Sequence, residues 1–218
     1  TNERSLSQGG LFEFERIRQF KPLVFYRTKP QKFEGIRSIY PNEKPLVKSL
    51  IKDQYKNHSL VHFTNLFKEN KYYVLEDKGV IYAGCQVTQN HWKVAGIGSP
   101  LKNKLVEMAL KFPRLKQIFD PKEFKFISLD HIFVKPGYEE ALFPFFESLL
   151  HQFDTHFGMI ALDTEDPLYE VLNNPNRLGI ASRIMTFKPG YVIAKGLDNY
   201  SLKPFYEKPV FISGLDVT

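Results

Sequence analysis

Two periodicities of apolar residues run along the chain and predict a mixture of helices and strands. Between Lys44 and Asn70 apolar residues recur every three or four positions, which indicates two helices separated at 57–59, with Ser59 as the cap of the second. The clearest helical spacing is formed by Leu142, Phe145, Phe146, Leu149, Leu150 and Phe153. Pro144 fits that helix only within its first turn, so the helix should begin near residues 139–141.

Runs rich in β-branched and aromatic residues predict the strands. They lie at 23–26, 71–75, 80–87, 124–134, 159–162, 180–187 and 191–195. Residues 76–79 (Glu-Asp-Lys-Gly) are typical of a hairpin turn between the second and third of these runs. Asp166 followed by Pro167 predicts the start of a short helix over 168–172, and residues 100–119 predict a helix interrupted at Pro113. The pattern therefore indicates an α/β protein of the α+β type, a mixed sheet flanked by helices.

Composition narrows this to a globular domain. The chain has 218 residues, of which 43% are apolar and 25% charged, so it is too apolar for disorder and too charged for a membrane protein. A single cysteine, Cys85, excludes an intramolecular disulfide framework, and no apolar run reaches the roughly 20 residues of a spanning helix. We therefore expect a cytoplasmic protein with no membrane contact. The chain starts at Thr1 without a signal-peptide pattern, and we expect it to be a trimmed piece of a longer protein.

Positive charge is concentrated near the N-terminus. Residues 1–60 hold 12 Lys and Arg against 6 Asp and Glu, whereas the remaining residues hold 18 of each, so the net charge of +6 belongs to the first quarter. We predict a basic arm, or the tail of a preceding domain, over 1–20 and a single domain over 21–218. Basic segments of this kind contact polyanions, and polyanion binding through residues 1–60 stays open as one function. No nucleic-acid motif accompanies the charge, so nucleic acid is not the expected partner.

Two local stretches stand out beside this order of elements. Residues 134–138 (Val-Lys-Pro-Gly-Tyr) close a predicted strand, and residues 166–172 (Asp-Pro-Leu-Tyr-Glu-Val-Leu) contain a predicted short helix. Together with the order of elements they resemble the GCN5-related N-acetyltransferase superfamily. Residues 134–138 look like the end of that family's fourth strand, where it enters the acyl-CoA loop, and residues 166–172 look like its helix with the leucine–tyrosine pair near the thioester. The resemblance implies an acyl-CoA N-acyltransferase-like fold with an inserted helix at 100–119. Some bacterial members are tandem proteins with one degenerate half, and the resemblance implies that this chain is a candidate C-terminal half with an upstream domain of the same family.

The resemblance also implies an activity and its residues. It implies transfer of an acetyl or other acyl group from acyl-CoA to an amine of a small molecule or peptide, with Tyr169 protonating the leaving thiolate. Asp130 is a candidate base, although as a strand neighbour of His131 it should point to the opposite face from it, which excludes a dyad. The cofactor would contact the backbone of five residues: Phe133, Val134, Gly137, Tyr138 and Ala141.

The loop that should hold the cofactor's pyrophosphate departs from the family pattern. Glu139 replaces the leading cation, and Leu142 and Pro144 stand near the positions of the family's glycines. Carboxylates at a helix start repel phosphate, and proline has no N–H to donate. A non-catalytic module that packs on or regulates a partner catalytic domain is therefore the alternative function. A second candidate for the phosphate loop contains Gly96 and Gly98.

The six histidines show no metal-binding spacing, so we expect no metal.

Overall fold

The computed structural model describes residues 12–94, 111, 118–185, 187–197 and 201–214. The strands are β1 (Glu15–Tyr26), β2 (Ile36–Ser38), β3 (Tyr72–Asp77), β4 (Val80–Trp92), β5 (Phe124–Val134), β6 (Phe157–Asp163) and β7 (Gly190–Ala194). The α-helices are α2 (Lys44–Gln54), α5 (Leu142–Gln152), α6 (Pro167–Leu172), α7 (Pro175–Leu178), α8 (Ala181–Ile184) and α9 (Lys203–Glu207). The described residues also contain the 3₁₀ turns η1 (Pro41–Glu43), η2 (Lys68–Asn70) and η3 (Glu139–Ala141).

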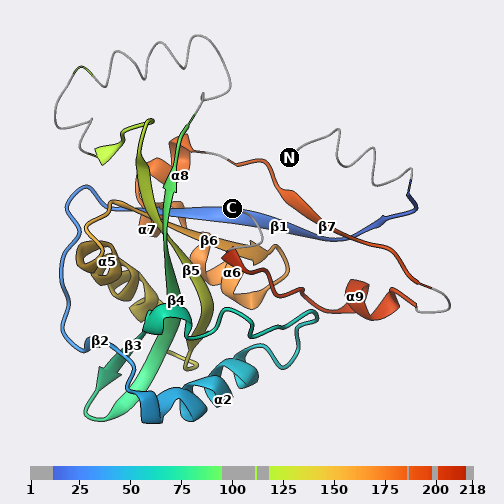
Figure 1. Ribbon diagram of the computed structural model, residues 1–218, viewed down its shortest axis with the longest axis horizontal. Helices are drawn as coiled ribbons and strands as arrows, with labels where there is room; N and C mark the ends of the chain where they lie inside the picture. Colours follow the sequence, from blue (N-terminus) through green and yellow to red (C-terminus); the bar gives the residue numbers. More distant parts are fainter. Residues whose placement is uncertain (1–11, 95–110, 112–117, 186, 198–200, 215–218) are drawn as a thin grey trace.

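All seven strands form one mixed sheet in the order β2-β3-β4-β5-β6-β1-β7. Neighbouring strands are antiparallel except β5 and β6, which run parallel. Strand β1 thus lies between β6 and β7. Strand β2, the next strand along the chain, lies at the opposite edge of the sheet. In Figure 1, β1 and β7 extend together away from the rest of the sheet, and α9 lies beside them.

Helices cover the sheet on both faces. Strand side chains alternate between faces, so Tyr73 on β3 faces the cluster formed with α5 and α6, while Tyr72 and Val74 face the cluster formed with α2. The α5 face holds the larger core, in which Phe145, Phe146, Leu149 and Leu150 are fully buried. The fold class expected from the sequence, a mixed sheet flanked by helices, is confirmed.

Local signals placed several elements correctly. Strand β5 has the predicted bounds, and η3 followed by α5 begins where the position of Pro144 required. The carboxylate of Asp166 caps α6 by accepting a 2.8 Å hydrogen bond from the amide of Leu168. Each of these segments carries its own start or stop residue, so its boundaries do not depend on the rest of the chain.

Other predictions were wrong or incomplete. The predicted second helix over 59–70 is a series of turns ending in η2, and left-handed backbone at Leu60, Phe67, Glu69 and Asn70 prevents a continuous helix. A strand was predicted over 180–187, but this stretch contains the short helix α8. The sequence patterns did not predict strand β2. Strand β1 begins at Glu15, so residues 15–20, assigned to the arm, are part of the sheet. The predicted helix at 100–119 falls mostly outside the described residues.

Within the described residues, none of the helices has both the length and the apolar character needed to cross a lipid bilayer.

Candidate functional site

A bulge in β5 sets the geometry at the centre of the sheet. The register between β4 and β5 shifts between Gly84 and Gln86, and His131 adopts a left-handed backbone with φ of 46°. The extra residue breaks the usual alternation of faces. The side chains of Asp130 and His131 consequently lie together, with Asp130 Oδ1 3.4 Å from His131 Nδ1, and the prediction that they point to opposite faces was wrong.

Asp130 is buried and its oxygens are already engaged. Oδ1 accepts a 2.7 Å hydrogen bond from the His131 amide, and Oδ2 accepts one of 2.6 Å from the Ser213 hydroxyl and one of 3.3 Å from the Gly214 amide. Only 6% of the residue is exposed. In this conformation the carboxylate accepts three hydrogen bonds from the chain itself and is buried, so it acts as a structural acceptor that links β5 to Ser213 and Gly214.

Residues 209–214 (segment 209–214) occupy the space where β5 and β6 separate. The two parallel strands pair only at Ile127–Gly158 and Ser128–Met159. Beyond these pairs the amide of Val210 donates a 3.0 Å hydrogen bond to Asp163 at the end of β6, while Ser213 and Gly214 reach Asp130 on β5. The segment thus bridges the two strands through side-chain carboxylates.

Segment 209–214 is also tied to the loop after α2. The amide of Ser59 donates to the Pro209 carbonyl at 2.8 Å, and the amide of Phe211 donates to the Ser59 carbonyl at 2.9 Å. The ring of Phe211 contacts Tyr55, His62 and His131 with centroid distances of 5.0, 5.5 and 4.8 Å. The space between β5 and β6 is therefore filled by aromatic side chains of the chain itself.

A second buried His–Asp pair adjoins this aromatic group. His58 Nε2 lies 3.0 Å from Asp166 Oδ2, and both side chains are almost fully buried. Burial, and then the nearby carboxylates of Asp166 and Asp130, raise the pKa of the Tyr55 hydroxyl well above its usual value. Sequence reasoning missed this pair, because His58 and Asp166 are 108 residues apart and no local pattern links them. No group of three His, Cys, Asp or Glu in the described part of the chain is arranged to hold a metal ion.

Tyr169 lies apart from Asp130. It sits in α6, packs against the core on the α5 face and is partly buried. Asp130 is hydrogen-bonded to segment 209–214 instead, and in the described residues no hydrogen bond or ring contact joins Tyr169 to Asp130. The structure therefore does not bring together the two side chains that the sequence proposed for proton transfer.

The predicted cofactor residues donate their amides within the chain. The amide of Val134 donates to Gln54 Oε1 at 3.3 Å, and that of Gly137, with φ of 86°, donates to Glu139 Oε1 at 3.1 Å. The Tyr138 amide donates to the Lys135 carbonyl at 3.0 Å, and the Ala141 amide to the Tyr138 carbonyl at 2.9 Å. Phe133 is paired with Gly84 in the sheet and its side chain is buried.

These residues do not fit an acyl-CoA pyrophosphate. A phosphate cradle needs backbone N–H groups that point outward and are free to donate. Here the Glu139 carboxylate already takes the place of an anion at Gly137, and Glu140 at the same helix start is ion-paired with Arg177. The rival loop with Gly96 and Gly98 lies outside the described residues.

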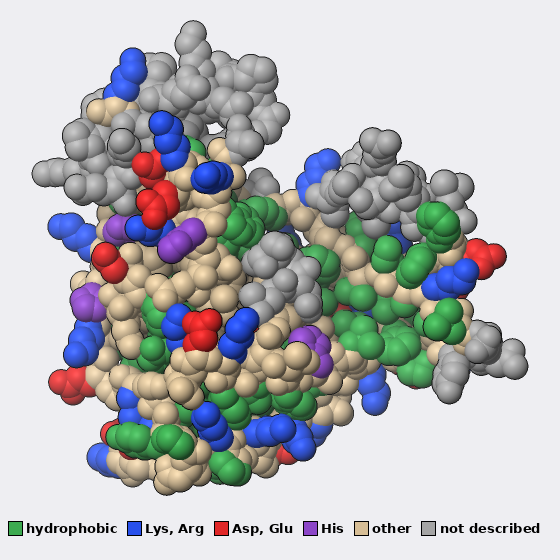
Figure 2. Space-filling model, viewed as in Figure 1, with side chains coloured by type: hydrophobic (Ala, Val, Ile, Leu, Met, Phe, Trp, Pro, Cys, Tyr) green, Lys and Arg blue, Asp and Glu red, His purple; other side chains and the backbone are tan. Residues whose placement is uncertain are grey.

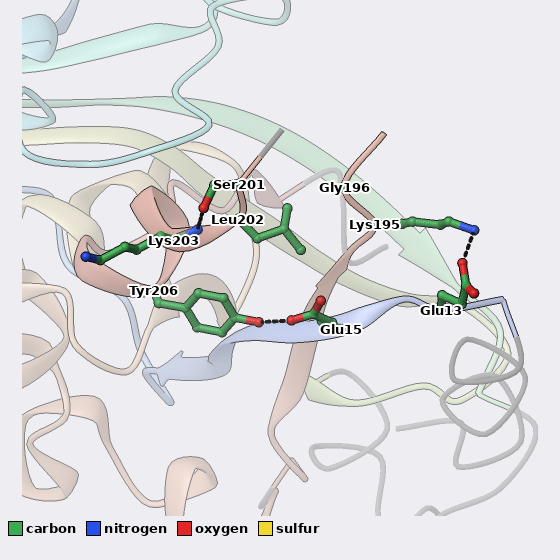
Figure 3. Close-up of a pocket in the computed structure, with 8 residues that line it drawn as sticks. All are labelled: Glu13, Glu15, Lys195, Gly196, Ser201, Leu202, Lys203 and Tyr206. Atoms are coloured by element: carbon green, nitrogen blue, oxygen red, sulfur yellow. Dashed lines mark hydrogen bonds and ion pairs between the residues drawn. The ribbon is translucent and has the colours of Figure 1, made fainter. Parts of the chain in front are cut away.

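A separate hollow lies between β1, β7 and α9. It encloses about 510 Å³ and is lined by Glu13, Glu15, Lys195, Gly196, Ser201, Leu202, Lys203 and Tyr206. Figure 3 shows the ion pair of Lys195 with Glu13 (2.8 Å) and the hydrogen bond from Tyr206 to Glu15 (2.6 Å). None of the predicted site residues lines this hollow.

Comparisons with known proteins add a distant likeness of fold. No family model and no curated protein matches the sequence. A solved structure of Saccharomyces cerevisiae N-myristoyltransferase with bound myristoyl-CoA and inhibitors is similar to 67% of this chain, with 11% identity and a TM-score of 0.42. A second, with bound myristoyl-CoA, has 10% identity over 67% of this chain and a TM-score of 0.42. The chain spans 43% and 42% of the length of these two proteins. At these TM-scores the likeness carries no argument about activity or ligand.

Proposed function

We propose that this chain is a non-catalytic module with an acyltransferase-like arrangement of strands, which binds a partner protein domain and does not take acyl-CoA. The observation that carries the proposal is the use of the amides at Val134, Gly137, Tyr138 and Ala141 within the chain. A cofactor would have to displace the Glu139 carboxylate from Gly137 and place its pyrophosphate beside two glutamates. Both steps oppose binding, because the first leaves a carboxylate without its partner and the second brings like charges together.

Segment 209–214 supports the same proposal. It fills the separation of β5 and β6 with the buried residues Val210, Phe211 and Ser213. An acyl chain or thioester entering there would have to displace Phe211 from Tyr55, His62 and His131 and release Ser213 from Asp130. The separation of β5 and β6 is therefore occupied by side chains of the chain itself.

An exposed apolar surface supports a protein partner. Hydrophobic side chains gather over β1, β7 and α9 in Figure 2. We call this the β7 surface and define it by Phe12, Phe14, Ile193, Leu197 and Tyr206, which are 38–69% exposed. Strand β7 is also an edge of the sheet. Grouped apolar residues beside an open strand edge are typical of a surface that another protein covers. The partner we propose is an upstream domain of the same polypeptide, as the sequence resemblance implied.

Titration calorimetry with coenzyme A tests the first half of the proposal. The chain should give no saturable heat with coenzyme A or acetyl-CoA at millimolar concentration, and its melting temperature should not change. A true ligand at 100 times its dissociation constant would stabilise the fold by about 2.7 kcal/mol, which a thermal melt detects easily. The variant E139A, which frees the Gly137 amide, should remain unable to bind because segment 209–214 is unchanged. Saturable binding to the wild-type chain would overturn the proposal.

Hydrogen exchange tests the second half. In the protein encoded by the complete reading frame, amides of β7 (Gly190–Ala194) should exchange at least about tenfold more slowly than in this chain alone, because a docked domain suppresses local opening. The other sheet edge, β2 (Ile36–Ser38), is the internal control and should exchange equally in both. Equal exchange of β7 in both proteins, or a reading frame that adds no folded domain, would contradict a partner at the β7 surface.

A further inference from the structure

A row of lysines on α2 has no part in the proposed function. Lys44, Lys48 and Lys52 recur at four-residue spacing along the helix, and Lys56 continues the spacing one turn beyond it. Residues four apart lie on neighbouring positions of a helix surface, so Lys44, Lys48 and Lys52 follow one side of α2, and Lys56 lies in the turn after it. We call these four residues the α2 lysine row. Lys and Arg side chains gather along the lower edge of Figure 2, over α2.

The α2 lysine row is not neutralised by its surroundings. Within the described residues, none of its four members forms an ion pair; Lys44 donates a hydrogen bond to the side-chain amide oxygen of Asn70. Two carboxylates close to the row in the sequence are engaged elsewhere, since Glu43 is held by Arg37 and Glu69 by Lys71. Asp53 lies within the row itself, between Lys52 and Lys56. Four ammonium groups against this one carboxylate leave the row with a net positive charge.

Aromatic rings beneath the row hold two of its side chains in place. Lys44 Nζ lies 5.7 Å from the ring centroid of Phe67, and Lys48 Nζ lies 5.4 Å from that of Phe63. Cation–π contacts of this kind orient an ammonium group while leaving its protons free for an anion. The rings themselves are turned to the core, where Phe67 packs on Tyr72 and Phe63 on His131, so they offer no stacking surface for a base.

We propose that the α2 lysine row binds the phosphate backbone of a double-stranded nucleic acid without reading its sequence. Lys44 to Lys52 cover about 12 Å along α2, over which a DNA duplex presents roughly seven phosphates. Protein interfaces are depleted in lysine, whereas nucleic-acid interfaces are strongly basic and polar. A lipid surface is disfavoured because α2 buries Val47 and Ile51 against the core and leaves Leu46 as its one strongly exposed large apolar side chain, too little to insert into a bilayer.

The salt dependence of binding to a labelled 20-base-pair DNA duplex tests the proposal. With three to four phosphates neutralised, the slope of log affinity against log salt should be about −2.7 to −3.6. Affinity should then fall roughly 40- to 150-fold between 50 and 200 mM salt. The variant K48Q/K52Q/K56Q should bind at least about tenfold more weakly at 50 mM salt and lose most of this slope. Glutamine has nearly the helix propensity of lysine, so α2 should be preserved.

The matched control K29Q/K32Q/K122Q removes the same charge from exposed positions elsewhere and should retain its affinity within about twofold. If both variants lost the same affinity for the duplex, binding would depend on net charge alone and the proposal would be overturned. It would also be overturned if the wild-type chain failed to bind the duplex at 50 mM salt. Binding through the same lysines to poly-L-glutamate or to phosphatidylserine vesicles, but not to the duplex, would assign the row to an acidic protein or a membrane instead. None of these outcomes depends on coenzyme A or on the β7 surface.

Discussion

The hydroxyl of Ser213 donates a 2.6 Å hydrogen bond to Asp130 although the two residues are 83 positions apart in the chain. Both are buried, and the amide of the next residue, Gly214, reaches the same carboxylate oxygen. A buried carboxylate is stable only where such donors satisfy it, so the contact couples the bulge of β5 to segment 209–214. Segment 209–214 is therefore a structural part of the region where β5 and β6 separate.

Replacing Phe211 with alanine should test how firmly this segment is held. Phe211 is 5% exposed and its ring meets Tyr55, His62 and His131, so F211A removes a well-packed aromatic side chain from the interior. We expect the free energy of unfolding in urea to fall by about 3–5 kcal/mol. The control F33A, at a residue 38% exposed, should cost less than half as much. A loss below about 1 kcal/mol for F211A would show that the segment does not depend on this ring.

Arg18 is the second anchor of the same region. Its guanidinium donates two 2.8 Å hydrogen bonds to the carboxylate of Asp163, which is fully buried, and so joins β1 to β6. The substitution R18M should reduce the free energy of unfolding by about 3–5 kcal/mol, because it leaves a buried carboxylate without its counter-charge. The control R16M, at an exposed position on the same strand, loses only a contact with the ring of Tyr191 and should cost less than about 1 kcal/mol. Equal effects of the two substitutions in chemical denaturation would contradict this account.

Sequence patterns predicted those elements whose boundaries are set locally. The run 124–134 is apolar and β-branched, and it is a strand with the expected bounds. The bulge within it was not predictable, because His131 takes its left-handed conformation from the pairing of β4 with β5, and no residue type marks the position. Tertiary contacts likewise override helical spacing over 59–70, where Gln86 accepts a hydrogen bond from the Phe67 amide and Ser59 pairs with Pro209.

The candidate site also has one feature that the sequence predicts and others that it does not. The substitution of Glu139 at the expected phosphate loop is visible in the sequence, and its contact with the Gly137 amide follows from their separation of two residues. Segment 209–214 carries no motif, and its partners Ser59, Asp130 and Asp163 lie 47 to 150 residues away in the chain. The position of β1 between β6 and β7 could not be predicted from the sequence either, because the order of elements along a chain does not fix the order of strands in a sheet.

Cys85 should be unreactive in the folded protein. It lies in β4 with no exposed surface, and burial, followed by the charge of nearby Asp130, raises the pKa of its thiol well above the usual value. The thiolate is the reactive form, so modification by a disulfide reagent at pH 8 should be on the order of a hundredfold slower in native buffer than in denaturant. The variant C85A/K122C, with a thiol at an exposed position, should react rapidly in both conditions. Fast reaction of the native wild-type chain would show that β4 opens readily to solvent.

Acid should destabilise the protein through Asp163. Burial alone would raise the pKa of this carboxyl, but hydrogen bonds from Arg18 and from the amides of Val210 and Glu165 outweigh it and hold the pKa below the ordinary 3.8. A carboxylate whose pKa is lower in the folded than in the unfolded state adds stability above the unfolded value and loses it as the pH falls through the folded value. The free energy of unfolding of the wild-type chain should therefore decline below about pH 4. D163N should be less stable at pH 6, because it removes the ion pair with Arg18, yet its stability should change less between pH 4 and pH 2. Parallel pH profiles for the two proteins would show that Asp163 does not contribute to the acid response.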